Sequence, residues 1–133
     1  MGAKKLKGTV KISGSKNSSL PILAATLLSN KKVKLLNLPR VKDIETMILL
    51  LRSLGSYVKY NKKNKSADIY NSKNIKTFAS YNLVKTMRAG ILVLGPLLAR
   101  FNKAKVSLPG GCAIGARPVD IHLKALSKLG VNY

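Results

Sequence analysis

The sequence predicts a mixed α/β domain in which helices pack against sheets. Strand-like alternation and amphipathic helical stretches succeed one another along the 133 residues, and glycine or proline separates many of them. A pattern of strand, helix and glycine also occurs twice, which indicates a repeated structural unit. With 46% hydrophobic residues, a chain of this length is sufficient for one domain with its own core.

The first half of the chain is expected to form strand–helix pairs followed by a hairpin. The predicted elements are a strand over 8–13, a helix from 17 or 18 to about 28, a strand over 32–38, a helix over 40–54, and a hairpin of 56–60 with 67–70. Asn17 or Ser18 is the expected cap of the first helix, with Pro21 in its first turn. Asp43 near the start of the second helix and Gly55 after its end mark its two boundaries.

The second half is expected to contain three helices and a strand. The predicted elements are a short helix from about 80, a mostly apolar buried helix over 90–101, a strand over 103–108, a helix over 118–129, and the beginning of a strand over 131–133. Lys85 and Arg88 are expected on one face of the short helix. Pro118 and Asp120 are start signals for the last helix, and Gly130 marks its end.

The internal repeat divides one domain, 1–133, into units of approximately 8–60 and 66–133. Each copy has a Leu-Pro pair after a strand, an arginine shortly before a valine and an aspartate, and a Leu-Gly pair at its end. The second copy carries an insertion of seven residues, 110–116, between the proline and the arginine, and this insertion contains Cys112. Because loops added to a scaffold commonly carry function, the repeat favours a functional Cys112.

Cys112 is the only cysteine in the chain, and three glycines surround it in the loop. A thiol beside Arg117 and a helix N-terminus has its thiolate favoured, which is typical of a reactive cysteine. The alternative is that Cys112 is a small buried hydrophobic residue. A single cysteine excludes a disulfide scaffold and fits a reducing compartment, so we expect a cytoplasmic protein.

A second candidate site lies at the start of the first helix. The turn of residues 14–17 places Lys16 and free backbone N–H groups at a helix N-terminus, which is suited to bind an anion. The turn lacks the second glycine and the Gly-Lys-Ser/Thr ending of a Walker motif. The alternative is a plain capped turn with no ligand.

The charge of the chain points to anionic partners. Twenty-five basic residues oppose four acidic ones, for a net charge of +21, and nucleic acid is the first candidate. However, the lysines are scattered, arginine-rich tracts are absent and few aromatics could stack on bases. We therefore expect small anionic substrates and not nucleic acid. We also expect no membrane partner, because the longest apolar stretch, 89–99, is too short to span a bilayer.

Four stretches of the chain resemble the UDP-N-acetylglucosamine enolpyruvyl transferases (UDP-N-acetylglucosamine 1-carboxyvinyltransferases). They are residues 13–25, 39–47, 87–101 and 109–120, and the Pro-Gly-Gly-Cys-Ala-Ile-Gly-Ala-Arg-Pro-Val-Asp run is the most specific. The resemblance implies a partial inside-out α/β barrel of the enolpyruvyl transferase type, with about two of the repeated units of one domain. It implies no cofactor and no metal.

The resemblance also implies an activity, the first committed step of peptidoglycan synthesis. In this family the enolpyruvyl group of phosphoenolpyruvate is transferred to the 3′-hydroxyl of UDP-N-acetylglucosamine. Cys112 matches the cysteine that protonates carbon three of the enol and that fosfomycin modifies. The residues that match phosphoenolpyruvate contacts are Lys16, Asn17 and Arg117, and those that match UDP-N-acetylglucosamine contacts are Arg88, Arg117, Pro118, Val119, Asp120 and Ile121.

Two of these residues have simpler interpretations, since Asp120 could serve only to cap its helix and Arg88 could be a surface arginine. The chain is a minority of the family's length, so we expect an incomplete portion that lacks the second domain and is inactive alone. A second chain that supplies the missing domain is then one expected partner. The alternatives are a basic nucleic-acid-binding module and a non-functional product of a truncated gene.

Overall fold

The computed structural model describes residues 7–85, 87–107 and 119–133, and its main sheet has three antiparallel strands. The strands are β1 (Val33–Leu35), β2 (Tyr57–Asn61) and β3 (Ser66–Tyr70), with β3 in the middle. The register sets Val33 opposite Ile69 and Tyr57 opposite Tyr70. The strand that follows α1 and the hairpin that follows α2 therefore share one sheet.

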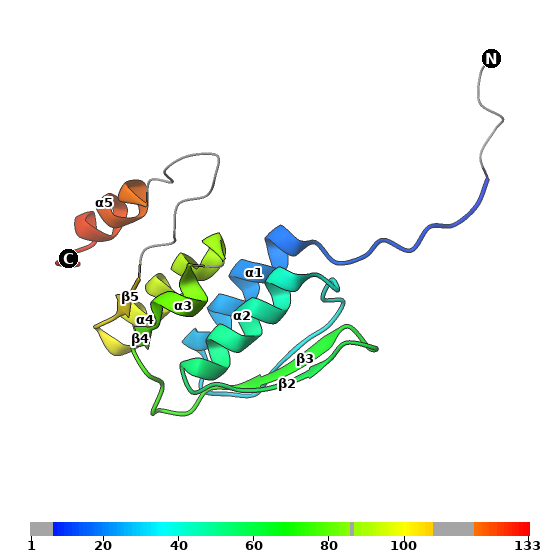
Figure 1. Cartoon of the computed structure of the whole chain (residues 1–133), viewed down its shortest axis with the longest axis horizontal. Helices are drawn as coiled ribbons and strands as arrows, with labels where there is room; N and C mark the ends of the chain where they lie inside the picture. Colours follow the sequence, from blue (N-terminus) through cyan, green and yellow to red (C-terminus); the bar gives the residue numbers. More distant parts are fainter. Residues whose placement is uncertain (1–6, 86, 108–118) are drawn as a thin grey trace, which may run out of the picture.

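Two helices cover one face of this sheet (Figure 1). They are α1 (Lys16–Ala25), which continues into the 3₁₀ turn η1 (Thr26–Leu28), and α2 (Lys42–Ser53). Val58, Ala67 and Ile69 are the buried residues of the two hairpin strands, as the two-residue period of a strand requires when one face is covered. The most deeply buried core side chains include Leu23, Leu27, Ile44, Met47, Leu51, Leu54 and Ile69.

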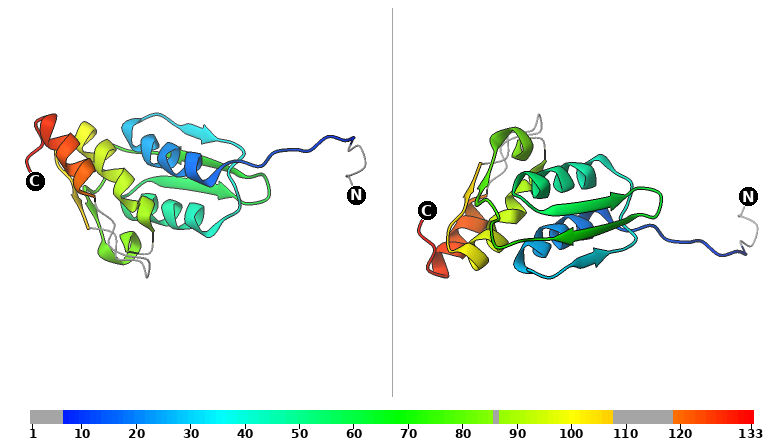
Figure 2. Two further views of the ribbon diagram at one scale, coloured as in Figure 1. Left: turned by 90° about the horizontal axis from the view of Figure 1, so that it is seen from above. Right: turned by 90° about the horizontal axis from the view of Figure 1, so that it is seen from below.

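The remaining elements lie beside this layer, toward the C-terminus (Figures 1 and 2). They are β4 (Phe78–Ala79), α3 (Tyr81–Val84), η2 (Arg88–Val93), α4 (Leu94–Phe101), β5 (Lys105–Val106) and α5 (Asp120–Lys128). β4 and β5 pair in parallel, with Phe78 opposite Lys105. Val84, Val93 and Leu97 join the same core, so one hydrophobic cluster holds the two groups of elements together.

Several predicted elements are confirmed. The second helix and the hairpin appear as α2, β2 and β3, close to the expected bounds. Gly55 follows α2 with φ of +102°, and Gly130 follows α5 with φ of +90°, a backbone region that favours glycine. The mixed α/β fold class is therefore confirmed.

The predicted strand over 8–13 is wrong. This segment has no strand partner among the described residues, and it projects from the helices toward the N-terminus (Figure 1). Val10 and Ile12 are 81% and 77% exposed, so the alternating pattern buries nothing. A strand needs a neighbour for its backbone hydrogen bonds, which alternation alone does not supply. The predicted strand over 131–133 is likewise absent.

The start of the first helix differs from the prediction. Ser15, and not Asn17 or Ser18, is the N-cap, and its Oγ accepts a hydrogen bond from the Ser18 N–H at 3.3 Å. The N-cap therefore lies two or three residues earlier than predicted, with Lys16 as the first residue of the helix. Pro21 consequently lies in the second turn instead of the first.

The helices after residue 80 are more broken than predicted. α3 ends at Val84, and Arg88 begins the separate 3₁₀ helix η2, so Lys85 and Arg88 do not share one helix face. The predicted helix over 90–101 is η2 followed by α4. Pro96 lacks the N–H that would bond to the carbonyl four residues earlier, so a regular α-helix cannot run through it from η2.

Candidate functional site

The first turn of α1 presents two of the candidate residues. Because Ser15 is the cap, Lys16 and Asn17 occupy the first two positions of the helix, where backbone N–H groups have no partner within the helix. Both residues are exposed. The positive end of the helix dipole and the lysine ammonium therefore face solvent together, which favours an anion.

The segment before α1 lies tightly against the connection between β1 and α2. A Cβ atom placed on Gly14 would overlap the carbonyl oxygen of Asn37 and approach the Pro39 Cδ to 3.3 Å. Only glycine permits this approach of two backbone segments. The Leu38 N–H donates to the Lys65 carbonyl at 2.8 Å, which ties the same connection to the hairpin. The start of α1 is therefore held in place by the connection between β1 and α2.

An ion pair joins the start of α1 to the start of α2. The Nζ of Lys16 lies 3.0 Å from Oδ2 of Asp43, and the two side chains are 47% and 41% exposed. Asp43 is in the first turn of α2, and α1 packs against α2. Two helix N-termini, a lysine and an aspartate thus meet at one accessible place.

Asp43 is the residue of this group that the sequence did not assign to a site. Its position in the first turn of a helix explains it as a boundary signal, and that interpretation hides its second contact. A signal was present in the composition, because only four acidic residues oppose 25 basic ones. Each acidic side chain in such a chain is a candidate to hold a particular lysine.

Arg88 is the first residue of η2, and η2 packs against α1. Its element is therefore adjacent to the helix that carries Lys16. Cys112, Arg117 and Pro118 lie outside the described residues.

Val119, Asp120 and Ile121 form the start of α5. Val119 holds the N-cap position and makes no side-chain cap hydrogen bond, while Asp120 is the first residue of the helix. The interpretation of Asp120 as the cap is therefore wrong, although a carboxylate in a first helical turn is favourable. Ile121 is 71% exposed. In the described structure α5 lies near the C-terminal end and not against the start of α1 (Figures 1 and 2).

Arg40, which lies within the resembling stretch 39–47, is structural. Its Nε donates to the Lys62 carbonyl at 2.9 Å, and its second terminal nitrogen donates to the Lys63 carbonyl at 3.1 Å. Both bonds hold the hairpin tip. The guanidinium therefore braces the hairpin against the start of α2.

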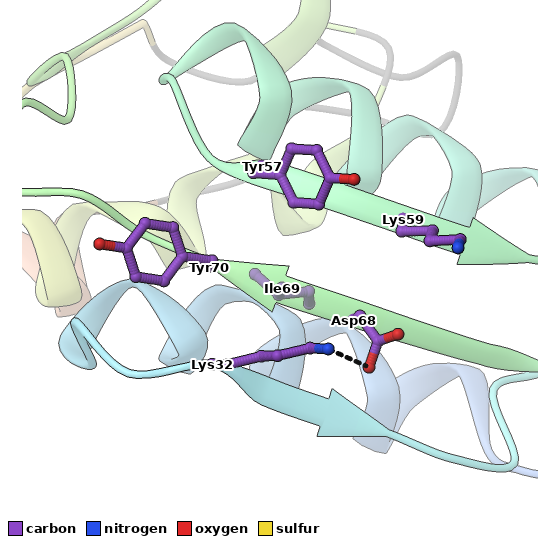
Figure 3. A pocket seen from close by; sticks show the side chains of 6 residues that line it. All are labelled: Lys32, Tyr57, Lys59, Asp68, Ile69 and Tyr70. Atoms are coloured by element: carbon purple, nitrogen blue, oxygen red, sulfur yellow. Dashed lines mark ion pairs between the residues drawn. The ribbon is translucent and has the colours of Figure 1, made fainter.

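A separate pocket of about 390 Å³ lies on the sheet (Figure 3). Tyr57 and Lys59 from β2 line it, with Asp68 and Tyr70 from β3. Lys32, also in the lining, is 3.9 Å from Asp68, so one of the two lysines is already paired. None of the candidate residues that the structure describes lines this pocket.

Over 7–85, 87–107 and 119–133, no cluster of three or more His, Cys, Asp or Glu side chains is placed to hold a metal ion. In the same ranges, the helices are all too short or too polar to cross a bilayer.

Residues 1–133 match the EPSP synthase (3-phosphoshikimate 1-carboxyvinyltransferase) family. The chain is 78% identical over 132 residues to a UDP-N-acetylglucosamine 1-carboxyvinyltransferase of Pelagibacter ubique, and 59% identical over 132 residues to one of Helicobacter pylori. Each match covers 99% of this chain and 31% of the relative, so the chain spans about a third of the length of these curated relatives.

A solved structure is similar in fold. The enolpyruvyl transferase NikO from Streptomyces tendae superposes with a TM-score of 0.78, over 98% of this chain and 28% of that chain. The sequence identity is 21%, so this likeness concerns the fold alone.

Proposed function

Since the chain belongs to the EPSP synthase family, we propose that it contributes to enolpyruvyl transfer from phosphoenolpyruvate to the 3′-hydroxyl of UDP-N-acetylglucosamine. The observation that carries the proposal is the 78% identity to a UDP-N-acetylglucosamine 1-carboxyvinyltransferase over nearly the whole chain. The accessible lysine at the start of α1 supports it, because the donor substrate is a small anion.

The reaction sets clear demands on the side chains. The sugar hydroxyl gives its proton to a base as its oxygen adds to carbon two of phosphoenolpyruvate, carbon three takes up a proton from an acid, and a tetrahedral adduct forms. Loss of a proton from carbon three and of phosphate from carbon two then gives the enolpyruvyl ether. An acid is needed at carbon three, and cations or N–H groups are needed at the phosphate and carboxylate.

We assign these roles as part of the proposal. Cys112 is the acid at carbon three, and Lys16 with Asn17 binds phosphoenolpyruvate at the start of α1. Arg117 binds the enolpyruvyl anion bidentately and contacts the sugar nucleotide. The remaining UDP-N-acetylglucosamine contacts are Arg88, Pro118, Val119, Asp120 and Ile121. The proposed architecture is two repeated units of an inside-out α/β barrel.

A chimera tests the proposal. The chain replaces the matching 132 residues of the Pelagibacter ubique relative, and phosphate release is measured with phosphoenolpyruvate and UDP-N-acetylglucosamine. We expect turnover within about tenfold of the relative, since replacement leaves most side chains unchanged. Cys112→Ser in the chimera should lower kcat by about a hundredfold or more, because a poorer acid replaces the thiol.

Two outcomes would contradict the proposal. One is a folded chimera, verified by circular dichroism, that releases no phosphate with this substrate pair. The other is a chimera that accepts 3-phosphoshikimate in place of the sugar nucleotide. Normal turnover of Cys112→Ser would refute the assignment of the acid while leaving the activity intact.

A further inference from the structure

We propose that Asp43 is a positioning residue for Lys16, which it holds in place to receive the anionic donor substrate. The inference rests on the proposed function and adds a residue to it. Asp43 does not contact substrate in this proposal. It acts through the ion pair of 3.0 Å between its Oδ2 and the Lys16 Nζ.

The flexibility of lysine explains why a holder is needed. Lys16 is the first residue of α1, and its side chain is 47% exposed, so the protein core does not restrict its four side-chain torsions. Ordering a free lysine on binding costs rotamer entropy, which reduces the affinity for the anion. An ion pair already formed in the free protein lowers that cost.

The position of Asp43 makes it suited to this task. The residue sits in the first turn of α2, so the partly positive N-terminus of its own helix stabilises its carboxylate. The backbone of α2 also fixes its direction toward α1. The ion pair thereby keeps the Lys16 ammonium beside the first turn of α2, and the N-terminus of a helix favours an anion.

The competing explanation is that Asp43 only stabilises the start of α2. The chain offers a matched control in Glu45, which lies in the same first turn. Glu45 also pairs with a lysine, since its Oε1 lies 2.7 Å from the Lys62 Nζ, and it is 43% exposed. The two carboxylates are therefore alike in helix position, exposure and pairing, and they differ in which lysine they hold.

The experiment compares Asp43→Asn with Glu45→Gln in the chimera. We expect Asp43→Asn to raise the KM for phosphoenolpyruvate by about fivefold, with the KM for UDP-N-acetylglucosamine and kcat within about twofold. Glu45→Gln should leave all three constants within about twofold. Asp43→Glu, which keeps the charge, should restore part of the lost KM.

A second measurement separates positioning from a structural role. In the Lys16→Met background, Asp43→Asn should add no further increase in the KM for phosphoenolpyruvate, because the residue it positions is gone. An additive effect would overturn the inference. If Asp43→Asn does not yield a folded chimera, the same test is made with Asp43→Glu. Any change that Asp43→Glu causes in the KM for phosphoenolpyruvate should disappear in the Lys16→Met background.

The experiment distinguishes failure of the proposed function from failure of the inference about Asp43. An inactive, folded wild-type chimera contradicts the proposed function, and the inference falls with it. An active chimera in which Asp43→Asn equals Glu45→Gln, or in which Asp43→Asn lowers the KM for phosphoenolpyruvate, contradicts the inference alone. A lower KM would show that the carboxylate competes with the substrate for Lys16.

Discussion

The guanidinium of Arg100 donates a hydrogen bond to the carbonyl oxygen of Leu27 at 2.8 Å, across 73 positions of sequence. The same side chain donates to the carbonyls of Ser29 at 3.3 Å, Asn71 at 3.4 Å and Ser72 at 3.1 Å. The planar fork of an arginine thus joins α4 to the end of η1 and to the chain after β3. The Ser29 carbonyl also accepts from the Asn71 Nδ2 at 3.3 Å, and backbone carbonyls at such a partly buried junction need donors.

Arg100→Ala should lower the free energy of unfolding by about 2–3 kcal/mol, because it leaves several partly buried carbonyls without this donor. Urea denaturation followed by circular dichroism measures the change. Arg40→Ala is the control, since Arg40 also donates to two carbonyls but is exposed at the hairpin tip, and its loss should cost under about 1 kcal/mol. Equal effects of the two substitutions would contradict a bracing role for Arg100.

Gly14→Ala should destabilise the contact between the segment before α1 and the β1–α2 connection. The new methyl group would overlap the Asn37 carbonyl, which is backbone and cannot rotate away, and we expect a loss of about 1–3 kcal/mol. Thermal unfolding and the amide chemical shifts of Asn37 and Leu38 report it. Gly8→Ala is the control, because nothing lies within 4 Å of a Cβ there. An unchanged Gly14→Ala variant would refute the close approach.

Two glycines of the second half should respond in opposite directions. A Cβ on Gly90 would meet Val84 Cγ1 at 3.0 Å and Val84 Cα at 3.3 Å, so Gly90→Ala should destabilise the chain by about 1–2 kcal/mol. Gly95 lies in α4 with nothing within 4 Å of a Cβ, and Gly95→Ala should stabilise by about 0.5 kcal/mol. Both are measured by urea denaturation, and the same sign for both would contradict this packing.

The ion pair of Lys62 with Glu45 should make a small pH-dependent contribution to stability. The hydrogen bond and charge of Glu45 raise the pKa of Lys62 above its usual 10.5. A raised pKa in the folded state means that the contribution is complete below 10.5 and is lost as pH rises above it. The difference in melting temperature between wild type and Glu45→Gln should therefore shrink above pH 10.5. A constant difference would contradict the pairing.

An element could be predicted when the residues that specify it lie close together in the sequence. α2 could be predicted because its apolar period, its acidic first turn and Gly55 all lie within one stretch of sequence. The hairpin of β2 and β3 has the same property. The segment over 8–13 alternates equally well but pairs with no described strand, because alternation does not supply a partner.

The candidate site was predictable to a similar degree. The helix start at Lys16 and Asn17 was found from a local turn, although the cap proved to be Ser15. The pairing of Lys16 with Asp43 was not found, since the two residues lie on different helices. Roles for Cys112 and Arg117 stay predictions that come from the resemblance of their loop to a known family.

By itself the sequence determined the mixed α/β class, the family and the places where helices α2 and α5 end. Their signals are local propensities and short motifs, which act through neighbouring residues. Only the tertiary structure decided that β3 lies between β1 and β2, that Arg100 joins distant carbonyls and that Asp43 faces Lys16. These contacts depend on the burial of one shared core, which brings together side chains that no local pattern relates.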